Sequence, residues 1–119
     1  MDKPNVQRWL TEAAPVLRRV SSAESRFTAA IRLNPTTTLA AADELEAATL
    51  EAMVWMMDNH CSEVRIDSRV ALMLNTCAEV ARTAKQVITH PSGDLEAIGD
   101  RLVDLLAKID FRSQSLDAW

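Results

Sequence analysis

His60 and Cys61 are the only adjacent pair of soft metal ligands in this sequence of 119 residues. A closed zinc site needs four protein ligands, so this pair supplies at most half of one. Cys61 is also a poor candidate nucleophile, because the nearest charged residues, Asp58 and Glu63, are acidic and would not lower the pKa of its thiol. We therefore expect a solvated His60 in a turn, and neither a metal site nor a catalytic residue here.

Neither histidine fits a pattern used by helical-bundle enzymes. A di-iron bundle needs Glu-x-x-His, and no Glu stands three residues before His60 or His90. A histidine phosphotransfer domain needs a Lys three residues after its His, but Glu63 and Gly93 occupy those positions. Helical ribonuclease-type bundles, with an Arg, four to six residues and then a His, are not matched either.

Carboxylates at helical spacing leave one enzymatic alternative open. Asp43-x-x-Glu46 loosely resembles the first half of the magnesium motif, Glu-x-x-Glu followed by Glu-x-x-Asp, of the all-α nucleotide pyrophosphohydrolases. Glu63-x-x-x-Asp67 has the wrong spacing for the second half. Surface acids at helical spacing are ordinary, so a magnesium-dependent hydrolase is kept only as an alternative, and we predict that the protein is not an enzyme.

Composition and charge restrict the class of partner. With 48% hydrophobic and 25% charged residues, 1–119 is expected to be a single globular domain. Residues 1–33 carry six basic and three acidic side chains, whereas 36–61 carry five acidic and no basic ones, so these segments should pack as neighbours. The net charge of −4 argues against a nucleic-acid partner. The sequence contains no apolar run of about 18 residues, so we predict no membrane span.

Cysteine usage and the N-terminal sequence indicate a compartment. Two cysteines are too few for a disulfide framework, and no secretory signal is visible at the start of the chain. We therefore expect a cytoplasmic protein. The excess of Arg over Lys, with abundant Ala, is typical of a GC-rich bacterial or phage source.

Helix-forming residues dominate the sequence, and the prolines mark where helices begin, end or bend. Periodicity predicts helices at about 4–33, 38–60, 63–89 and 93–110, followed by a tail at 111–119. Any of Thr36 to Thr38 could cap the second helix, and Pro15 should kink the first. Four such helices with short connections predict an all-α, antiparallel up-down-up-down four-helix bundle.

One end of this predicted bundle gathers the largest apolar side chains. The start of the first helix, the end of the second, the start of the third and the end of the fourth, with the tail, meet there. The run Met53–Met57 covers the whole circumference of a helix, so some of its side chains should remain exposed after the core is filled. We predict an interface or ligand-binding surface formed by Trp9, Met53, Val54, Trp55, Met56, Met57, Leu72, Met73, Phe111 and Trp119.

Three interpretations of this end stay open. The side chains could fill a wide core under the folded-back tail, bind a small apolar ligand between helices, or form a protein interface. Exposed Met and Trp side chains are typical of protein interfaces. The leading hypothesis is thus a small cytoplasmic adaptor or regulator that forms a homodimer or binds a helical protein partner, with no cofactor, nucleic acid or membrane.

Overall fold

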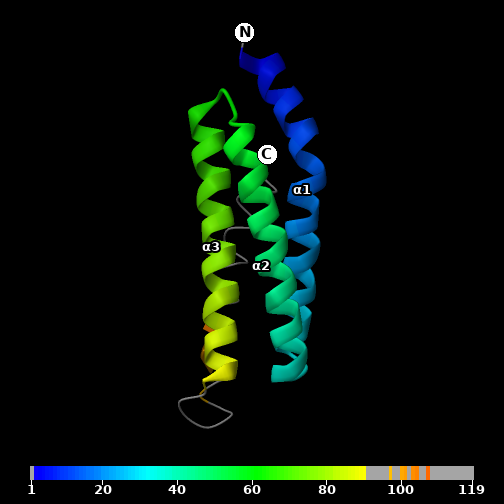
Figure 1. Cartoon of the computed structure of the whole chain (residues 1–119), viewed down its shortest axis with the longest axis vertical. Helices are drawn as coiled ribbons and strands as arrows, with labels where there is room; N and C mark the ends of the chain where they lie inside the picture. Colours follow the sequence, from blue (N-terminus) through cyan, green and yellow to red (C-terminus); the bar gives the residue numbers. More distant parts are fainter. Residues whose placement is uncertain (1, 91–96, 98–99, 102, 105–106, 108–119) are drawn as a thin grey trace.

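Three long helices form the described part of the chain. The structure, a computed structural model, describes residues 2–90 and, beyond them, residues 97, 100, 101, 103, 104 and 107. The helices are α1 (Asp2–Ile31), α2 (Pro35–Asp58) and α3 (Val64–Thr89). They lie side by side with alternating direction, so that the start of α1 lies at the same end as the turn between α2 and α3 (Figure 1). The described residues contain no strand, which confirms the all-α class.

The predicted count of four helices is not matched, because the structure resolves three helical elements in the residues it describes. The predicted fourth helix, 93–110, lies mostly outside those residues; its described positions, from 97 to 107, have helical backbone. The predicted tail, 111–119, lies outside them entirely. The first three helices lie close to their predicted ranges.

The start of α2 differs from the sequence prediction. Asn34, and none of the threonines from Thr36 to Thr38, is the N-cap, and its side chain accepts a hydrogen bond of 2.8 Å from the backbone N–H of Thr37. Pro35 then occupies the first helical turn, where its missing N–H costs nothing. Thr38 is instead fully buried, with its hydroxyl 3.0 Å from the carbonyl oxygen of Ala30. The Asn34-Pro35 pair thus starts α2, while also standing just after the end of α1.

Pro15 lies inside α1 without ending it. Its side chain is exposed, so the ring points away from the helix packing. The ribbon of α1 changes direction about halfway along its length (Figure 1). A proline at this position removes one backbone donor from the helix, which is the cause expected for a bend there.

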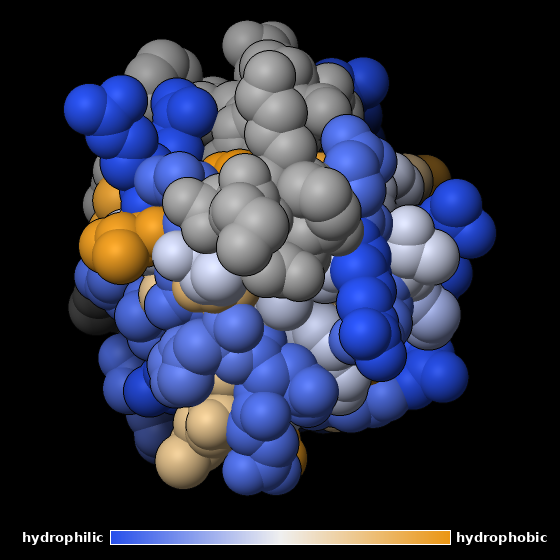
Figure 2. All heavy atoms as spheres, turned by 90° about the horizontal axis from the view of Figure 1, so that it is seen from above, coloured by the Kyte–Doolittle hydropathy of each residue, from blue (hydrophilic) through white to orange (hydrophobic). Residues whose placement is uncertain are grey.

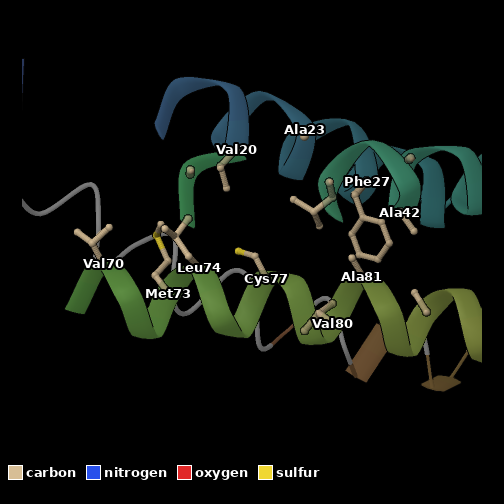
Figure 3. Packing of buried hydrophobic residues seen from close by; sticks show 14 of the residues in the cluster. Val20, Ala23, Phe27, Ala42, Val70, Met73, Leu74, Cys77, Val80 and Ala81 are labelled. Carbon is tan, nitrogen blue, oxygen red and sulfur yellow. The ribbon is translucent and has the colours of Figure 1, made fainter. Parts of the chain in front are cut away.

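The helix α2 lies between the other two and packs against both, whereas α1 and α3 have few close backbone contacts with each other (Figure 1). Phe27 of α1 is fully buried and points towards Ala81 of α3, beside Ala42 of α2 (Figure 3). Leu45 and Leu74 are also fully buried. The core therefore runs along the inner face of α2, and it leaves the opposite face of that helix without a neighbour among the described helices.

The predicted attraction between the basic first segment and the acidic second one is confirmed. Arg19 pairs with Glu51, and Arg26 pairs with Glu44 at 2.7 Å, so that α1 and α2 are joined along one edge. These pairs are half exposed, and such surface pairs contribute little free energy each. Their main effect is to fix which face of α1 lies beside α2.

Candidate functional site

Two of the three tryptophans close the end of the bundle where α1 begins. The rings of Trp9 and Trp55 lie with centroids 5.7 Å apart and planes at 52°. Trp9 is buried, and its indole N–H donates a hydrogen bond of 2.6 Å to the backbone carbonyl of Asn59 in the α2–α3 turn. The side chain of Asn59 in turn donates to the carbonyl of Trp55 at 2.9 Å. Trp9 therefore ties the start of α1 to the turn and presents little surface to a partner.

The α2–α3 turn is organised by Asp67. One carboxylate oxygen accepts a hydrogen bond of 2.9 Å from the backbone N–H of Cys61, and the other lies 3.1 Å from Nδ1 of His60. His60 is exposed, whereas Cys61 is buried. Among the described residues no three His, Cys, Asp or Glu side chains are grouped so as to hold a metal ion. The carboxylate of Asp67 thus has a structural partner on both oxygens.

The residues predicted to form one surface divide into three groups in the structure. Trp9, Met56 and Met73 belong to the core, and Trp55 and Met53 are partly buried against it. The exposed members are Val54, Met57 and Leu72. Phe111 and Trp119 lie outside the described residues. Seen from the end that carries the α2–α3 turn, the coloured surface is largely hydrophilic and its apolar areas are small and separate (Figure 2).

An exposed apolar row instead follows the outer face of α2. Ala47, Leu50, Val54 and Met57 are all exposed, with Leu50 at 45%, Val54 at 61% and Met57 at 72%. Their steps of three, four and three residues place them on one helix face, which is the spacing of a helix–helix seam. We call these four residues the outer row. It extends the predicted surface along the side of α2, away from the end of the bundle.

A narrow apolar groove adjoins the outer row on the side of α3. Met53 and Met57 of α2 line it together with Ala71 and Leu74 of α3, and its volume is about 200 Å³. Met57 therefore belongs to both the groove and the row. Leu72, on α3, is exposed but does not line this groove.

A second hollow of about 390 Å³ lies on the other side of the row, between α1 and α2. Small side chains of both helices line it, namely Ser22 and Ala23 of α1 with Ala47 and Ala48 of α2. Its charged lining residues are Arg18, Arg19, Arg26, Glu44 and Glu51. The small residues leave room beside the row.

The acids of the loose magnesium motif have basic partners. Lys85 of α3 lies 2.6 Å from Asp43 and 2.9 Å from Glu46, and Arg82 lies 3.2 Å from Glu46. The hydrogen bonds to Asp43 and Glu46 raise the pKa of Lys85, which stays charged. A magnesium ion would have to displace these cations from both carboxylates.

The two cysteines are free and buried. Burial, with the negative charge of Glu24 as a smaller cause, raises the pKa of the Cys77 thiol to about 12. A thiol in this state is neutral at physiological pH and is a poor nucleophile. Cys77 therefore acts as a small core residue between the helices (Figure 3).

In comparisons with known proteins, no family model, curated protein or solved structure matches the chain. In the part of the chain that the structure describes, no helix has both the length and the apolar character that a bilayer span requires.

Three features of the surface around α2 were missed in the sequence: Ala47, Leu50 and the arginine-lined hollow. The prediction was based on the run Met53–Met57 in the last turns of α2. Leu50 and Ala47 lie on the same helix face, one and two turns before Val54. Counting the seam spacing backwards from Met57 would have found the row. The hollow depends on how α1 and α2 approach each other, and no sequence pattern contains that information.

Proposed function

We propose that this chain is a small interaction domain of the adaptor or regulatory type, which self-associates through the outer row of α2. The observation that carries the proposal is the exposure of Leu50, Val54 and Met57 on one face at seam spacing. A soluble protein gains free energy by covering such a row, at about 25 cal/mol for each Å² of apolar surface removed from water. We further propose that the protein is cytoplasmic, in keeping with its two free cysteines.

A fourth helix from 93–110 is part of the same proposal. Its apolar spacing, through Leu95, Ile98, Leu102, Leu105 and Ile109, supports an amphipathic helix that packs on the first three. The interface proposed here needs only the outer face of α2.

The apolar-ligand alternative is supported by the groove between α2 and α3 but is the weaker candidate. Pockets for small organic ligands usually have volumes of about 300–1,000 Å³, and this groove has about 200 Å³. A hollow of that size suits a single side chain of a protein partner. The magnesium-hydrolase alternative is weaker still, because Lys85 and Arg82 already neutralise its acids.

A pair of matched substitutions tests the proposal. Val54→Asp places a charge in the middle of the outer row, and we expect a folded monomer under conditions in which the parent protein is dimeric. Leu72→Asp makes the same kind of change at an exposed position on α3, 49% accessible and outside the row, and should leave the dimer intact. Light scattering gives the mass and circular dichroism gives the helix content. Equal masses for the two variants would contradict the proposal.

A further inference from the structure

We propose that residues 93–110 cover a seam between α1 and α3 of the same chain, on the side of these helices that points away from α2. The proposal rests on the fourth helix of the proposed function, and it adds where that helix lies and which chain supplies it. We call this surface the far seam. It is formed by Leu17, Glu24 and Ile31 of α1 with Met73, Val80 and Val87 of α3.

The α3 side of the far seam points away from α2. Arg82 and Lys85 pair with acids of α2, so they mark the flank of α3 that faces α2. Val80 stands two residues before Arg82, which at 3.6 residues per turn places it on nearly the opposite side of the helix. Met73 and Val87 lie seven residues away from Val80 in either direction and therefore share its flank.

This flank is nevertheless buried within a single copy of the chain. Met73 is 5% exposed, Val80 is 2% exposed and Val87 is 3% exposed. The helix α2 lies on the other flank, and α1 has few close backbone contacts with α3. The segment after α3 is the remaining stretch of chain that is long enough to cover these side chains.

The α1 side of the far seam has the same construction. Arg19 and Arg26 pair with acids of α2 and mark the flank of α1 that faces it. Leu17 and Glu24 each stand two residues before one of these arginines, so they lie on nearly the opposite side of α1. Glu24 is 9% exposed, and Leu17 and Ile31 are partly buried. Both helices thus turn a covered flank away from α2.

The described positions of the segment show which of its faces is turned outward. Residues 100, 101, 103, 104 and 107 have helical backbone and are exposed. In Figures 1 and 3 the described positions of this segment lie beside α3. The opposite face of such a helix carries the apolar positions Leu95, Ile98, Leu102, Leu105 and Ile109. This is the face that we assign to the far seam.

The spacing of the two sequences gives a register. Three of the apolar positions repeat every seven residues, as the seam residues of α3 do, and each stands as far after residue 91 as its counterpart stands before it, namely Leu95 with Val87, Leu102 with Val80 and Ile109 with Met73. Antiparallel helices joined by a short connection bring such positions to the same level. A helix over 93–110 is about 27 Å long, which exceeds the roughly 21 Å from Met73 to Val87.

The outer row of α2 is the other apolar surface that this segment could cover. Leu50, Val54 and Met57 are 45–72% exposed in the same chain in which Val80 is buried. The difference in exposure assigns residues 93–110 to the far seam. The outer row then stays open to a second molecule.

Disulfide formation within the chain tests the position of the segment. The variant Val80→Cys/Leu102→Cys is prepared with Cys61 and Cys77 replaced by alanine, and it is oxidised at low concentration without denaturant. We expect an intrachain disulfide, because these positions face each other in the proposed register. The matched control Val80→Cys/Val103→Cys moves one cysteine to an exposed position and should react at least about tenfold more slowly. Mass spectrometry and a count of free thiols measure both.

A second pair guards against a variant that fails to fold. Met73→Cys/Ile109→Cys lies at the level farthest from residue 91, and circular dichroism before oxidation shows whether each variant is helical. We expect the same intrachain disulfide. A folded variant in which neither pair closes would overturn the proposal.

The other outcomes identify a different occupant or a different position. A disulfide between two chains would show that the segment of a second copy covers the far seam, and rapid closure of Val54→Cys/Leu102→Cys would place the segment on the outer row. Either result overturns the proposal. Self-association is measured separately, from the mass of the parent protein. A monomeric parent whose far-seam pairs close would contradict the proposed function and leave the far seam standing.

Discussion

The inner and outer faces of α2 are built from similar residues and have opposite environments. On the inner face Leu45 and Ala52 are completely buried and Met56 is 5% exposed, whereas on the outer face Leu50, Val54 and Met57 are 45–72% exposed. The helix is apolar around most of its circumference, yet the described helices cover only one side of it. Hydrophobic content therefore does not identify the core of this protein; the position of α1 and α3 does. The outer face is the surface through which we propose that the protein self-associates.

The largest expected effect comes from comparing one leucine on each face. Leu45→Ala should lower the free energy of unfolding by about 2–5 kcal/mol, because it opens a cavity in a closed core. Leu50→Ala should change the stability of the monomer by less than about 1 kcal/mol, because its side chain already contacts water. Urea unfolding at a concentration where the protein is monomeric measures both. Similar losses for the two leucines would remove the distinction between the faces.

The pH dependence of the free energy of unfolding tests the buried environment of Cys77 in the core. The pKa of Cys77 is raised from 9.0 to about 12 in the folded protein, so the folded state holds the thiol proton more tightly than the unfolded state. The stabilisation is complete below pH 9 and is lost as the pH rises towards 12, at about 1 kcal/mol per pH unit. Cys77→Ala should show a shallower decline over the same range in urea unfolding. Parallel declines would mean that Cys77 is not the responsible group.

Trp9 tests whether the end of the bundle is core or surface. Trp9→Phe removes the indole hydrogen bond to the carbonyl of Asn59 and should cost about 1–2 kcal/mol of unfolding free energy. The mass of the protein should not change, because Trp9 is buried and lies outside the outer row. A monomeric Trp9→Phe variant with unchanged stability would place Trp9 in the interface instead.

The smallest effect is expected at the edge between the two faces. Glu51→Gln removes the pairing with Arg19, which is half exposed, and should reduce stability by no more than about 0.5–1 kcal/mol. Urea unfolding in low and in high salt would measure this loss of stability. Added salt screens the ion pair in the parent protein, so the difference in unfolding free energy between the parent and the variant should become smaller. A larger loss that is independent of salt would assign Glu51 a role beyond this ion pair.

The sequence predicted the helices better than it predicted the surface. Periodicity and prolines located α1, α2 and α3, because each helix carries its own apolar pattern and end signals. The cap at Asn34 was missed, since Asn34-Pro35 reads equally well as the end of one helix or the start of the next. Trp9 and Met56 were assigned to a surface but lie in the core, because the exposure of a residue depends on how helices approach one another. Val54 and Met57 were predicted to belong to the surface and are exposed.

The mass of the parent protein as a function of its concentration tests the central proposal most directly. We expect a weak dimer, with a Kd on the order of 10 µM, because a row of four side chains buries less surface than a standard interface. Sedimentation equilibrium between about 1 µM and about 100 µM should then show the average mass rising from that of one chain, 13.2 kDa, towards twice that value. A mass that stays at 13.2 kDa over the whole range would contradict self-association through the outer row of α2.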